Sequence, residues 1–303
     1  MTERMNNHLL SYIEEFPDAT LRDCQMSLQR RFKKEVSYTT IHRYLNWNMY
    51  SLKDLRRERL GMNTAENIEK QRQYCQVLKD HQAAGNFLIY MDETNFNTYQ
   101  HCTRGRSFRG DRAVITLPSS KSANLQIQLA VNLHVGVIHS QAVNTSIHAS
   151  VTADFIKDVY RMALDTEAYM SMYKSKKVVI ILDNAPAHCH THENLMELLQ
   201  GPELAMLEVV SLGPYSPMLN PCKGCFSVLK SKINSKMQEN RGRMNDFTTR
   251  GQMQAFRMDL LQTCWQECLE ENVINAALVQ KEKAHCHEFV GLALQSMPMP
   301  LGK

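Results

Sequence analysis

The stretch FLIYMD, residues 87–92, decides the fold together with its counterpart VVIILD, residues 178–183. Both runs are apolar up to their last residue, which is typical of strands buried on both faces of a sheet. Each run ends in an aspartate, and a carboxylate just beyond the carboxyl end of a central strand lies at the mouth of the sheet. The sequence therefore predicts an α/β domain in which Asp92 and Asp183 face a common site.

Further elements surround these two strands in the predicted domain, residues 86–240. Alternating polar and apolar residues predict an antiparallel pair of strands over 126–134 and 137–144. The other expected elements are a helix over 152–164, a short strand near 207–210, a proline-rich loop over 213–217 and a basic helix from about Pro221.

The N-terminal residues 1–50 predict a helix-turn-helix domain. A capping-box pattern at Thr20–Asp23 begins one helix, and Ser37 is the expected N-cap of a second helix over 38–47. The second helix would present short or hydrogen-bonding side chains that suit phosphates and base edges. With the cap, these residues are Ser37, Thr39, Thr40, His42, Arg43 and Asn46. A plain helical hairpin with polar residues in water is the alternative.

Two further segments complete the predicted organisation. Residues 51–85 are strongly charged and helical in pattern, so we predict a linker helix there. Residues 241–303 predict a helical C-terminal tail, in which Trp265 and Leu269 indicate packing or dimer contacts.

The composition is ordinary for a globular protein. The 303 residues include 43% hydrophobic and 22% charged residues, which excludes wholesale disorder, and no apolar run has the length of a membrane span. Nine cysteines without a secretory signal predict reduced thiols. We therefore expect an intracellular protein with no membrane partner, located in the nucleus if the host is a eukaryote.

Positive charge is concentrated between Tyr215 and Arg250. Seven Lys or Arg face two acids there, a local excess of five within a chain of net charge +4. Such a surface suits a phosphate backbone, and it suits a solvated helix face equally well. The lysines that we expect to contact DNA are Lys230, Lys232 and Lys236.

Asp92 and Asp183 offer hard oxygen ligands for Mg²⁺ or Mn²⁺. Two such ions, about 3.5 to 4 Å apart, stabilise the attacking and leaving oxygens of a phosphodiester displacement. The alternative is that both residues only cap loops, since aspartates often follow strands in α/β proteins. Glu93 is a poor substitute for Asp92, because adjacent strand residues point to opposite faces.

Four fragments occur in a specific order along the chain. They are MDETNF at 91–96, RGRSFRG at 104–110, ILDNAPAH at 181–188 and PYSPMLNP at 214–221. Together they resemble the catalytic domain of the mariner-type DDE transposases, and the resemblance covers roughly Asn86 to Met237.

The resemblance implies an RNase H-like fold, a mixed five-stranded sheet flanked by helices, with a set of three acids that binds Mg²⁺. It also implies that the helix-turn-helix binds transposon ends, so double-stranded DNA is the expected partner, and it is compatible with a homodimer. The family's first acid falls on Asp92 and its second on Asp183, with Asn184, His188 and Asn220 expected to support the site. The family commonly carries two helix-turn-helix units, whereas this chain has room for one before the linker.

The family's third acid is replaced in this chain. Its position lies two residues after an Asn-Pro pair and 223 − 183 = 40 positions after Asp183, where the sequence has Lys223. One unit-charge pair at about 4 Å is worth on the order of 4 kcal/mol at an effective dielectric near 20, and the lysine turns attraction for a metal into repulsion. We therefore expect metal affinity to fall sharply and the ammonium to neutralise the two aspartates instead. A relocated acid, Glu193 or Glu239, is the alternative.

These observations predict a transposase-like DNA-binding protein whose ancestral activity is metal-dependent DNA cleavage and strand transfer, that is, transposition and DNA integration. Lys223 impairs that activity, so Mg²⁺ or Mn²⁺ is the expected cofactor if the chain is active and none if it is not. The alternative is a non-catalytic DNA-binding regulator or transposition repressor. A zinc-stabilised module, suggested by the Cys222/Cys225 and Cys264/Cys268 spacings, is a weaker alternative.

Overall fold

The computed structural model divides the chain into two compact units, Met1–Arg59 and Leu60–Lys303. It describes residues 1–53, 59, 61–97, 108, 112, 124–144, 147–184, 191–199, 201–240 and 250–300. The predicted supporting residue His188 lies outside these ranges, as does most of the fragment at 104–110.

The first unit is a bundle of three helices, α1 (Glu3–Glu15), α2 (Leu21–Phe32) and α3 (Tyr38–Trp47). The predicted capping box is present at the start of α2. The Thr20 hydroxyl accepts a hydrogen bond from the Asp23 N–H, and the Asp23 carboxylate accepts one from the Thr20 N–H. The predicted start of α2 and the predicted bounds of α3 are confirmed, and the three helices close around one small apolar core.

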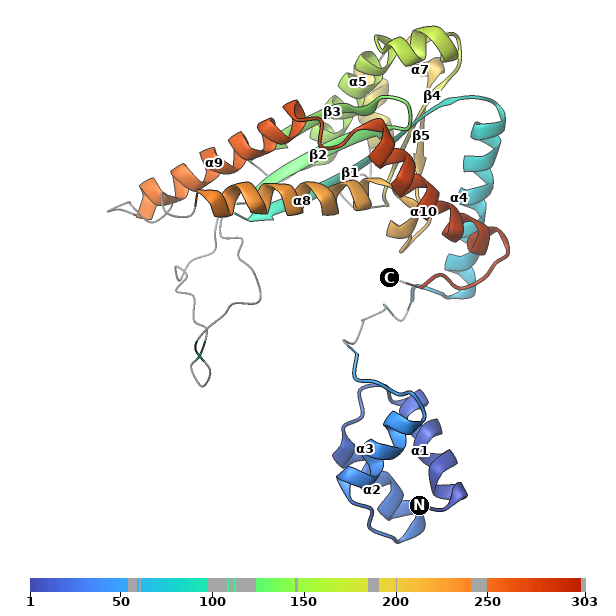
Figure 1. Ribbon diagram of the computed structural model, residues 1–303. Helices are drawn as coiled ribbons and strands as arrows, with labels where there is room; N and C mark the ends of the chain where they lie inside the picture. The colour runs from blue at the N-terminus through green and yellow to red at the C-terminus, as the bar shows by residue number, and fades with distance from the viewer. Residues whose placement is uncertain are drawn as a thin grey trace. The chain divides into compact units, whose positions relative to one another are not determined.

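The second unit is built on a mixed five-stranded sheet with the order β3-β2-β1-β4-β5 (Figure 1). Its strands are β1 (Phe87–Asn97), β2 (Asn124–Asn132), β3 (Gly136–Val143), β4 (Val178–Leu182) and β5 (Leu207–Ser211). β2 pairs antiparallel with β1 and β3, whereas β4 pairs parallel with β1 and β5, so β2 runs opposite to the other four strands. The predicted mixed sheet flanked by helices is confirmed.

Helices cover both faces of this sheet. One face carries α4 (Ala65–Ala83), α8 (Cys222–Glu239), α9 (Arg250–Glu270) and α10 (Ala276–Leu294). The other carries α5 (Ala149–Leu164) and α6 (Thr191–Leu198). Shorter helical segments are η1 (Tyr169–Tyr173), α7 (Pro202–Met206) and η3 (Pro217–Leu219). Within the described ranges, no helix combines the length and apolar character needed to cross a membrane.

Two predictions about domain organisation are corrected. The helix predicted over 51–85 is present as α4, but it packs into the second unit and is not a linker, with Tyr74, Cys75 and Leu78 buried there. Its many charged residues lie on the other side of the helix and mask this apolar stripe in the sequence. The segment predicted as a helical tail over 241–303 does form helices, α9 and α10, but both belong to the same core, where Trp265 is 8% exposed.

Candidate active site

Asp92 lies within β1 rather than at its end. β1 continues to Asn97, because its second half pairs antiparallel with β2, where Asp92 is opposite Leu129. The prediction that this strand ends at Asp92 is therefore wrong. The parallel pairing with β4 nevertheless stops at Tyr90, opposite Ile181, so Asp92 stands beyond the parallel part of the sheet.

Asp183 follows β4 directly, as predicted, since that strand ends at Leu182. Ile181 and Tyr90 pack in the core beneath α8, and side chains alternate along a strand. The same alternation puts Asp183 and Asp92 on this face of the sheet. The negative charge of Asp183 raises the pKa of Asp92. This effect is smaller than the rise caused by burial and the lowering caused by Lys223.

Asn184 and the end of β5 are joined by one hydrogen bond. The Asn184 side-chain amide donates to the carbonyl of Leu212, the residue after β5. Leu212 in turn donates its N–H to the Leu182 carbonyl at 2.8 Å. The chain that leaves β4 at Asp183 is thereby held next to the chain that leaves β5.

Asn220 fixes the first turn of α8 against β1. Its side-chain amide donates to the Met91 carbonyl at 3.0 Å, and its Oδ1 accepts a hydrogen bond from the Cys222 N–H at 3.0 Å. The Cys222 thiol donates to the Tyr90 carbonyl at 3.2 Å. These hydrogen bonds fix the backbone position from which the side chain of the next residue, Lys223, extends.

Lys223 forms an ion pair with Asp92. Its Nζ lies 2.7 Å from Oδ2 and donates a hydrogen bond to Oδ1 at 2.9 Å. The Asp92 side chain is 1% exposed, whereas the Lys223 side chain is 43% exposed. Oδ2 is buried and accepts no hydrogen bond from the described residues, so its compensation comes from the ammonium charge.

Burial raises the pKa of Asp92 to about 6, because the carboxylate loses its hydration, and the charge and hydrogen bond of Lys223 oppose this rise. For Lys223, burial lowers the pKa, but Asp92 and then Asp183 outweigh that effect and leave it above the usual value. The first shift disfavours the ionised pair and the second favours it. With these pKa values both side chains are charged near pH 7, so Asp92 and Lys223 form an ion pair.

Residues 87–244, which contain Asp92, Asp183 and Lys223, match the family described as DDE superfamily endonuclease. The chain belongs to this family. The matched DDE domain spans more than half of the chain and includes all five strands of the sheet.

Solved structures of the mariner transposase Mos1 share the fold. Its paired-end complex with Mg superposes with a TM-score of 0.63 at 14% identity, covering 100% of this chain and 82% of that chain. Its strand transfer complex gives 0.62 at 14% identity, with coverages of 98% and 79%. At this identity the likeness concerns the fold, and it confirms the predicted mariner-type DDE architecture. A comparison with curated proteins found no match.

The DDE domain of this chain does not fit a bound metal ion at the acid site. The third acid position holds Lys223, and its ammonium already contacts the Asp92 carboxylate that a metal would need. Across the described residues, no three His, Cys, Asp or Glu side chains are placed to hold a metal ion. The arrangement that the residues form is an internal ion pair, and the metal-ligand role of Asp92 and Asp183 stays a prediction.

The two acids considered as replacements lie elsewhere. Glu239 is 239 − 223 = 16 residues along α8 from Lys223, about 24 Å along the helix axis. Glu193 is exposed on the first turn of α6, a helix whose apolar residues pack on the opposite face of the sheet. Neither position favours a relocated third acid.

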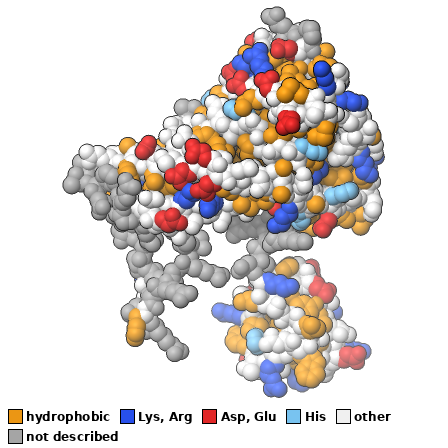
Figure 2. Space-filling view, turned by 45° about the horizontal axis from the view of Figure 1, so that its top comes forward, with side chains coloured by type: hydrophobic (Ala, Val, Ile, Leu, Met, Phe, Trp, Pro, Cys, Tyr) orange, Lys and Arg blue, Asp and Glu red, His pale blue; other side chains and the backbone are white. Residues whose placement is uncertain are grey.

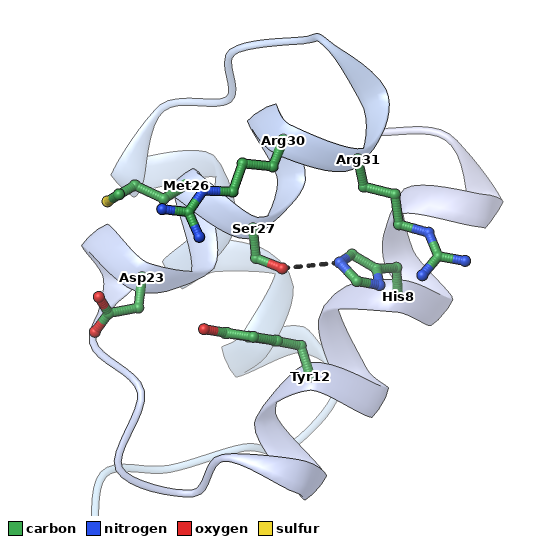
Figure 3. A pocket seen from close by; sticks show the side chains of 7 residues that line it. All are labelled: His8, Tyr12, Asp23, Met26, Ser27, Arg30 and Arg31. Atoms are coloured by element: carbon green, nitrogen blue, oxygen red, sulfur yellow. Dashed lines mark hydrogen bonds between the residues drawn. The ribbon is translucent and has the colours of Figure 1, made fainter.

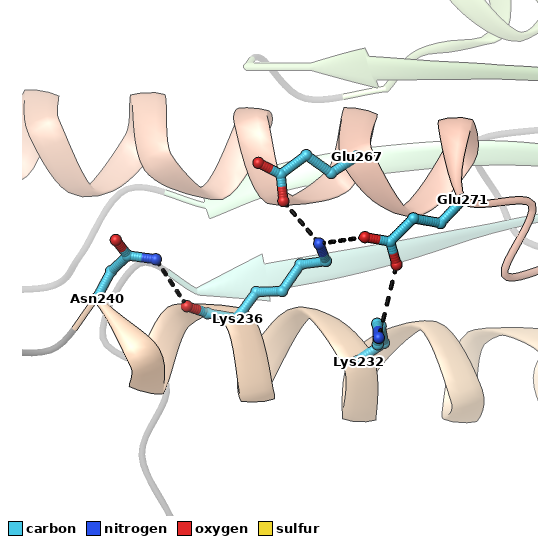
Figure 4. A network of polar contacts seen from close by, with 5 residues as sticks. All are labelled: Lys232, Lys236, Asn240, Glu267 and Glu271. Carbon is cyan, nitrogen blue, oxygen red and sulfur yellow. Dashed lines mark hydrogen bonds and ion pairs between the residues drawn. The ribbon is translucent and has the colours of Figure 1, made fainter.

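The lysines predicted to contact DNA on α8 differ in their surroundings. Lys236 Nζ lies 2.7 Å from Glu267, on α9, and 2.6 Å from Glu271, the residue that follows α9, and its side chain is 15% exposed (Figure 4). Lys232 pairs with Glu271 at 3.5 Å. Basic and acidic side chains accordingly lie side by side over the α8–α9 arm in Figure 2. These ion pairs disfavour a DNA contact by Lys232 and Lys236, which stays a prediction.

Lys230 faces the site instead of α9. Its Nζ lies 5.7 Å from the centroid of the Phe96 ring. Burial and then the charge of Lys223 lower its pKa, while Asp92 raises it. Lys230 therefore belongs to the same cluster of interacting charges as Lys223 and Asp92.

The residues of the first unit predicted to face DNA are all exposed. The Ser37 Oγ accepts a hydrogen bond from the Thr40 N–H at 3.3 Å, so the predicted N-cap is confirmed. The Ser37 hydroxyl thus stabilises the start of α3. The His42 and Asn46 side chains lie 3.4 Å apart. Arg43 makes no ion pair with the described residues, so its charge is available to a ligand.

Two contacts around the site have no sequence signal. A methyl group added at Gly224 would lie 1.9 Å from Glu282 Oε2, so α8 and α10 approach closely there. Lys283 Nζ lies 4.8 Å from the centroid of the Tyr90 ring, and burial lowers its pKa. Both contacts join residues far apart in the chain, and only the helix packing brings them together.

The cysteine pairs considered for zinc are free, buried thiols. Cys222 and Cys225 are buried residues of α8, and Cys264 and Cys268 are buried residues of α9. Burial raises the pKa of Cys264 to about 11, which opposes the thiolate form that a metal requires. The thiols pack as small apolar side chains.

Proposed function

We propose that this protein is a DNA-binding derivative of a DDE transposase in which an internal ion pair has replaced metal-dependent strand cleavage. The observation that supports this is the 2.7 Å contact between Lys223 Nζ and Asp92 Oδ2 at the third acid position. The same contact supports the alternative function, a non-catalytic regulator or transposition repressor.

The ion pair weakens the electrostatic attraction of the acid site for a cation. In a metal-dependent displacement, bound ions stabilise the attacking and leaving oxygens of the phosphodiester. Here Asp92, Asp183 and Lys223 sum to one negative charge, where three carboxylates would give three. Asn220 and Cys222 pin the first turn of α8, so the ammonium is held at Asp92 by the fold.

DNA binding is proposed for the exposed face of α3, where Arg43 and the polar residues beside it reach solvent. The Mos1 structures that share the fold are described as paired-end and strand transfer complexes, which supports double-stranded transposon ends as the ligand. Pairing two ends in that way would take two copies of the chain. In a eukaryotic host this function requires a nuclear location.

The first experiment separates binding from chemistry. A duplex selected from random DNA by the full chain is incubated with Mg²⁺ or Mn²⁺, and nicking is compared for the natural chain, Lys223→Glu and the control Lys223→Gln. We expect binding that persists in EDTA and after Asp92→Asn, no cutting by the natural chain or Lys223→Gln, and metal-dependent nicking by Lys223→Glu.

Two results would contradict the proposal. Robust metal-dependent cutting by the natural chain that disappears in Glu193→Ala would assign the chemistry to a relocated acid. Absence of any DNA affinity at low salt would remove the binding function itself.

A further inference from the structure

A groove in the first unit lies between α1 and α2 (Figure 3). It has a volume of about 470 Å³. The residues lining it are His8 and Tyr12 of α1 and Asp23, Met26, Ser27, Arg30 and Arg31 of α2. None of them belongs to the face of α3 proposed to contact DNA.

The groove lies on the flank of α2 that faces away from α3. Cys24 points into the core of the unit, and Gln25 donates a hydrogen bond at 2.8 Å to the carbonyl of Val36, on the chain leading to α3. In a helix with 3.6 residues per turn, Ser27 falls on the opposite side of Cys24 from Gln25. A ligand in the groove would therefore leave the exposed face of α3 free.

Positive charge exceeds negative charge in this groove. Arg30 and Arg31 are exposed and form no ion pair with the described residues. Asp23 is the acid of the lining, and its Oδ2 is already engaged by the Thr20 N–H at 2.9 Å and the Thr20 hydroxyl at 2.6 Å. The groove thus contains two guanidinium groups and one carboxylate, and that carboxylate already accepts hydrogen bonds from Thr20.

Neutral hydrogen-bonding groups complete the lining. His8 Nε2 and Ser27 Oγ lie 2.9 Å apart, and Figure 3 shows this pair between the two arginines. Burial and then Arg31 lower the pKa of His8, so the imidazole is neutral near pH 7. The Tyr12 phenol also points into the groove (Figure 3). Guanidinium groups with hydroxyl donors beside them are the side chains that bind phosphate oxygens best in proteins.

We propose that the α1–α2 groove binds a phosphate group of a nucleic-acid backbone through Arg30, Arg31 and the Ser27–His8 pair. The charge of the groove and the proposed DNA contact of α3 in the same unit favour nucleic acid as the source of the phosphate. In this respect the inference rests on the proposed function. The phosphate site itself does not depend on the acid site or on α3.

The arginines also have a purely structural explanation, because cations in the last turn of a helix stabilise its dipole. That role affects folding stability and predicts no ligand. The experiment must therefore measure a ligand at the groove, with stability checked separately by thermal unfolding of each variant.

The first arm titrates inorganic phosphate into the isotope-labelled full chain and follows the resonances of His8, Ser27, Arg30 and Arg31 by NMR. We expect saturable shifts that KCl at equal ionic strength does not produce. The Arg30→Gln/Arg31→Gln variant should lose these shifts, and Arg43→Gln, on α3, should keep them. Shifts that KCl reproduces, or that survive in the double variant, would overturn the site.

The second arm identifies the source of the phosphate by binding a labelled duplex over a range of KCl concentrations. Arg30→Gln/Arg31→Gln should bind about tenfold more weakly, and the slope of log K against log[KCl] should fall by about one to two. The control Arg4→Gln/Lys34→Gln removes two charges of the same unit outside the groove and should change both quantities less.

The two arms keep the outcomes separate. Phosphate shifts with an unchanged duplex affinity in Arg30→Gln/Arg31→Gln would overturn nucleic acid as the source and leave an anion from a protein or metabolite. A chain that binds no duplex at all would contradict the proposed function, while the phosphate titration would still decide whether the groove is a site.

Discussion

Replacing Lys223 by methionine should reveal what the ion pair contributes, because the change removes the charge and keeps an unbranched stem. At the observed 2.7 Å, two unit charges attract by about 6 kcal/mol at an effective dielectric of 20. The Lys223 side chain is 43% exposed, so water screens the pair and roughly half of this value is realistic. We expect Lys223→Met to lower the free energy of unfolding by about 3 kcal/mol near pH 7, in line with other broken buried pairs.

The loss should shrink in acid. The pKa of Asp92 is about 6 in the folded protein, above the usual aspartate value of 3.8, so the folded state binds more protons between these values. Stability therefore falls as pH rises through that window and recovers as pH drops. Without the ammonium the pKa of Asp92 rises further, which moves the window upward. The deficit of Lys223→Met against the natural chain should then be smaller at pH 5 than at pH 7.5.

The double variant Asp92→Asn/Lys223→Met is the matched control, since it removes both charges. Replacing a whole buried pair is often neutral or stabilising, so we expect stability close to that of the natural chain. Urea unfolding can follow Trp265, which is 8% exposed in the second unit. A Trp47→Phe background removes the other tryptophan, which is 87% exposed in the first unit.

The reasoning would be refuted by a Lys223→Met variant as stable as the natural chain at pH 7.5, with no dependence on pH between 5 and 7.5. That result would mean that water, rather than the ammonium, compensates the Asp92 carboxylate. A double variant as unstable as Lys223→Met would instead mean that the loss does not come from the uncompensated charge of Asp92.

Three further substitutions test the contacts that build the site, each by the same urea assay. Gly224→Ala should lower the free energy of unfolding by about 1 kcal/mol, because the added methyl would meet the Glu282 side chain. Alanine in place of glycine normally stabilises a helix interior by about the same amount, so in a Glu282→Ala background the substitution should become stabilising. Asn220→Ala leaves the Met91 carbonyl and the Cys222 N–H without a partner and should cost about 2 to 4 kcal/mol, so a cost below 1 kcal/mol would contradict its anchoring role. Gly213→Ala would bring a methyl 2.8 Å from the Gln71 Cα and should cost about 1 to 3 kcal/mol, whereas Gly251→Ala, whose methyl would meet no atom of the described residues within 4 Å, should not.

Local patterns predicted the elements that carry the site. The apolar run at 178–182 is β4, and the N-cap and periodicity around Ser37 give α3 with the predicted bounds. These predictions succeed because the signal for each lies within the element itself. The identity of the residue at the third acid position was also readable, since it depends on spacing from a motif.

Features set by tertiary pairing were not readable. β1 extends five residues past Asp92 because β2 pairs with it there, and the polar residues of that segment do not indicate a strand. α4 is a core helix because α10, some 200 residues away, packs on it. The 2.7 Å contact of Lys223 likewise needs the hydrogen bonds of Asn220 and Cys222, which no local pattern announces.

Restoring the acid should turn the site into one that depends on a divalent cation for stability as well as for chemistry. In Lys223→Glu three carboxylates would share the acid site, one of them 1% exposed, and their mutual repulsion would raise the pKa of Asp92 above its present value of about 6. Bound Mg²⁺ would relieve that repulsion and stabilise the folded state by about 2.7 kcal/mol at a concentration one hundred times its Kd. We therefore expect Mg²⁺ to raise the Tm of Lys223→Glu by several degrees, and to leave the natural chain and Lys223→Gln unchanged. An equal rise in the natural chain would show that it binds the ion despite its lysine, and the ion pair would then not be the state that the protein adopts in the presence of metal.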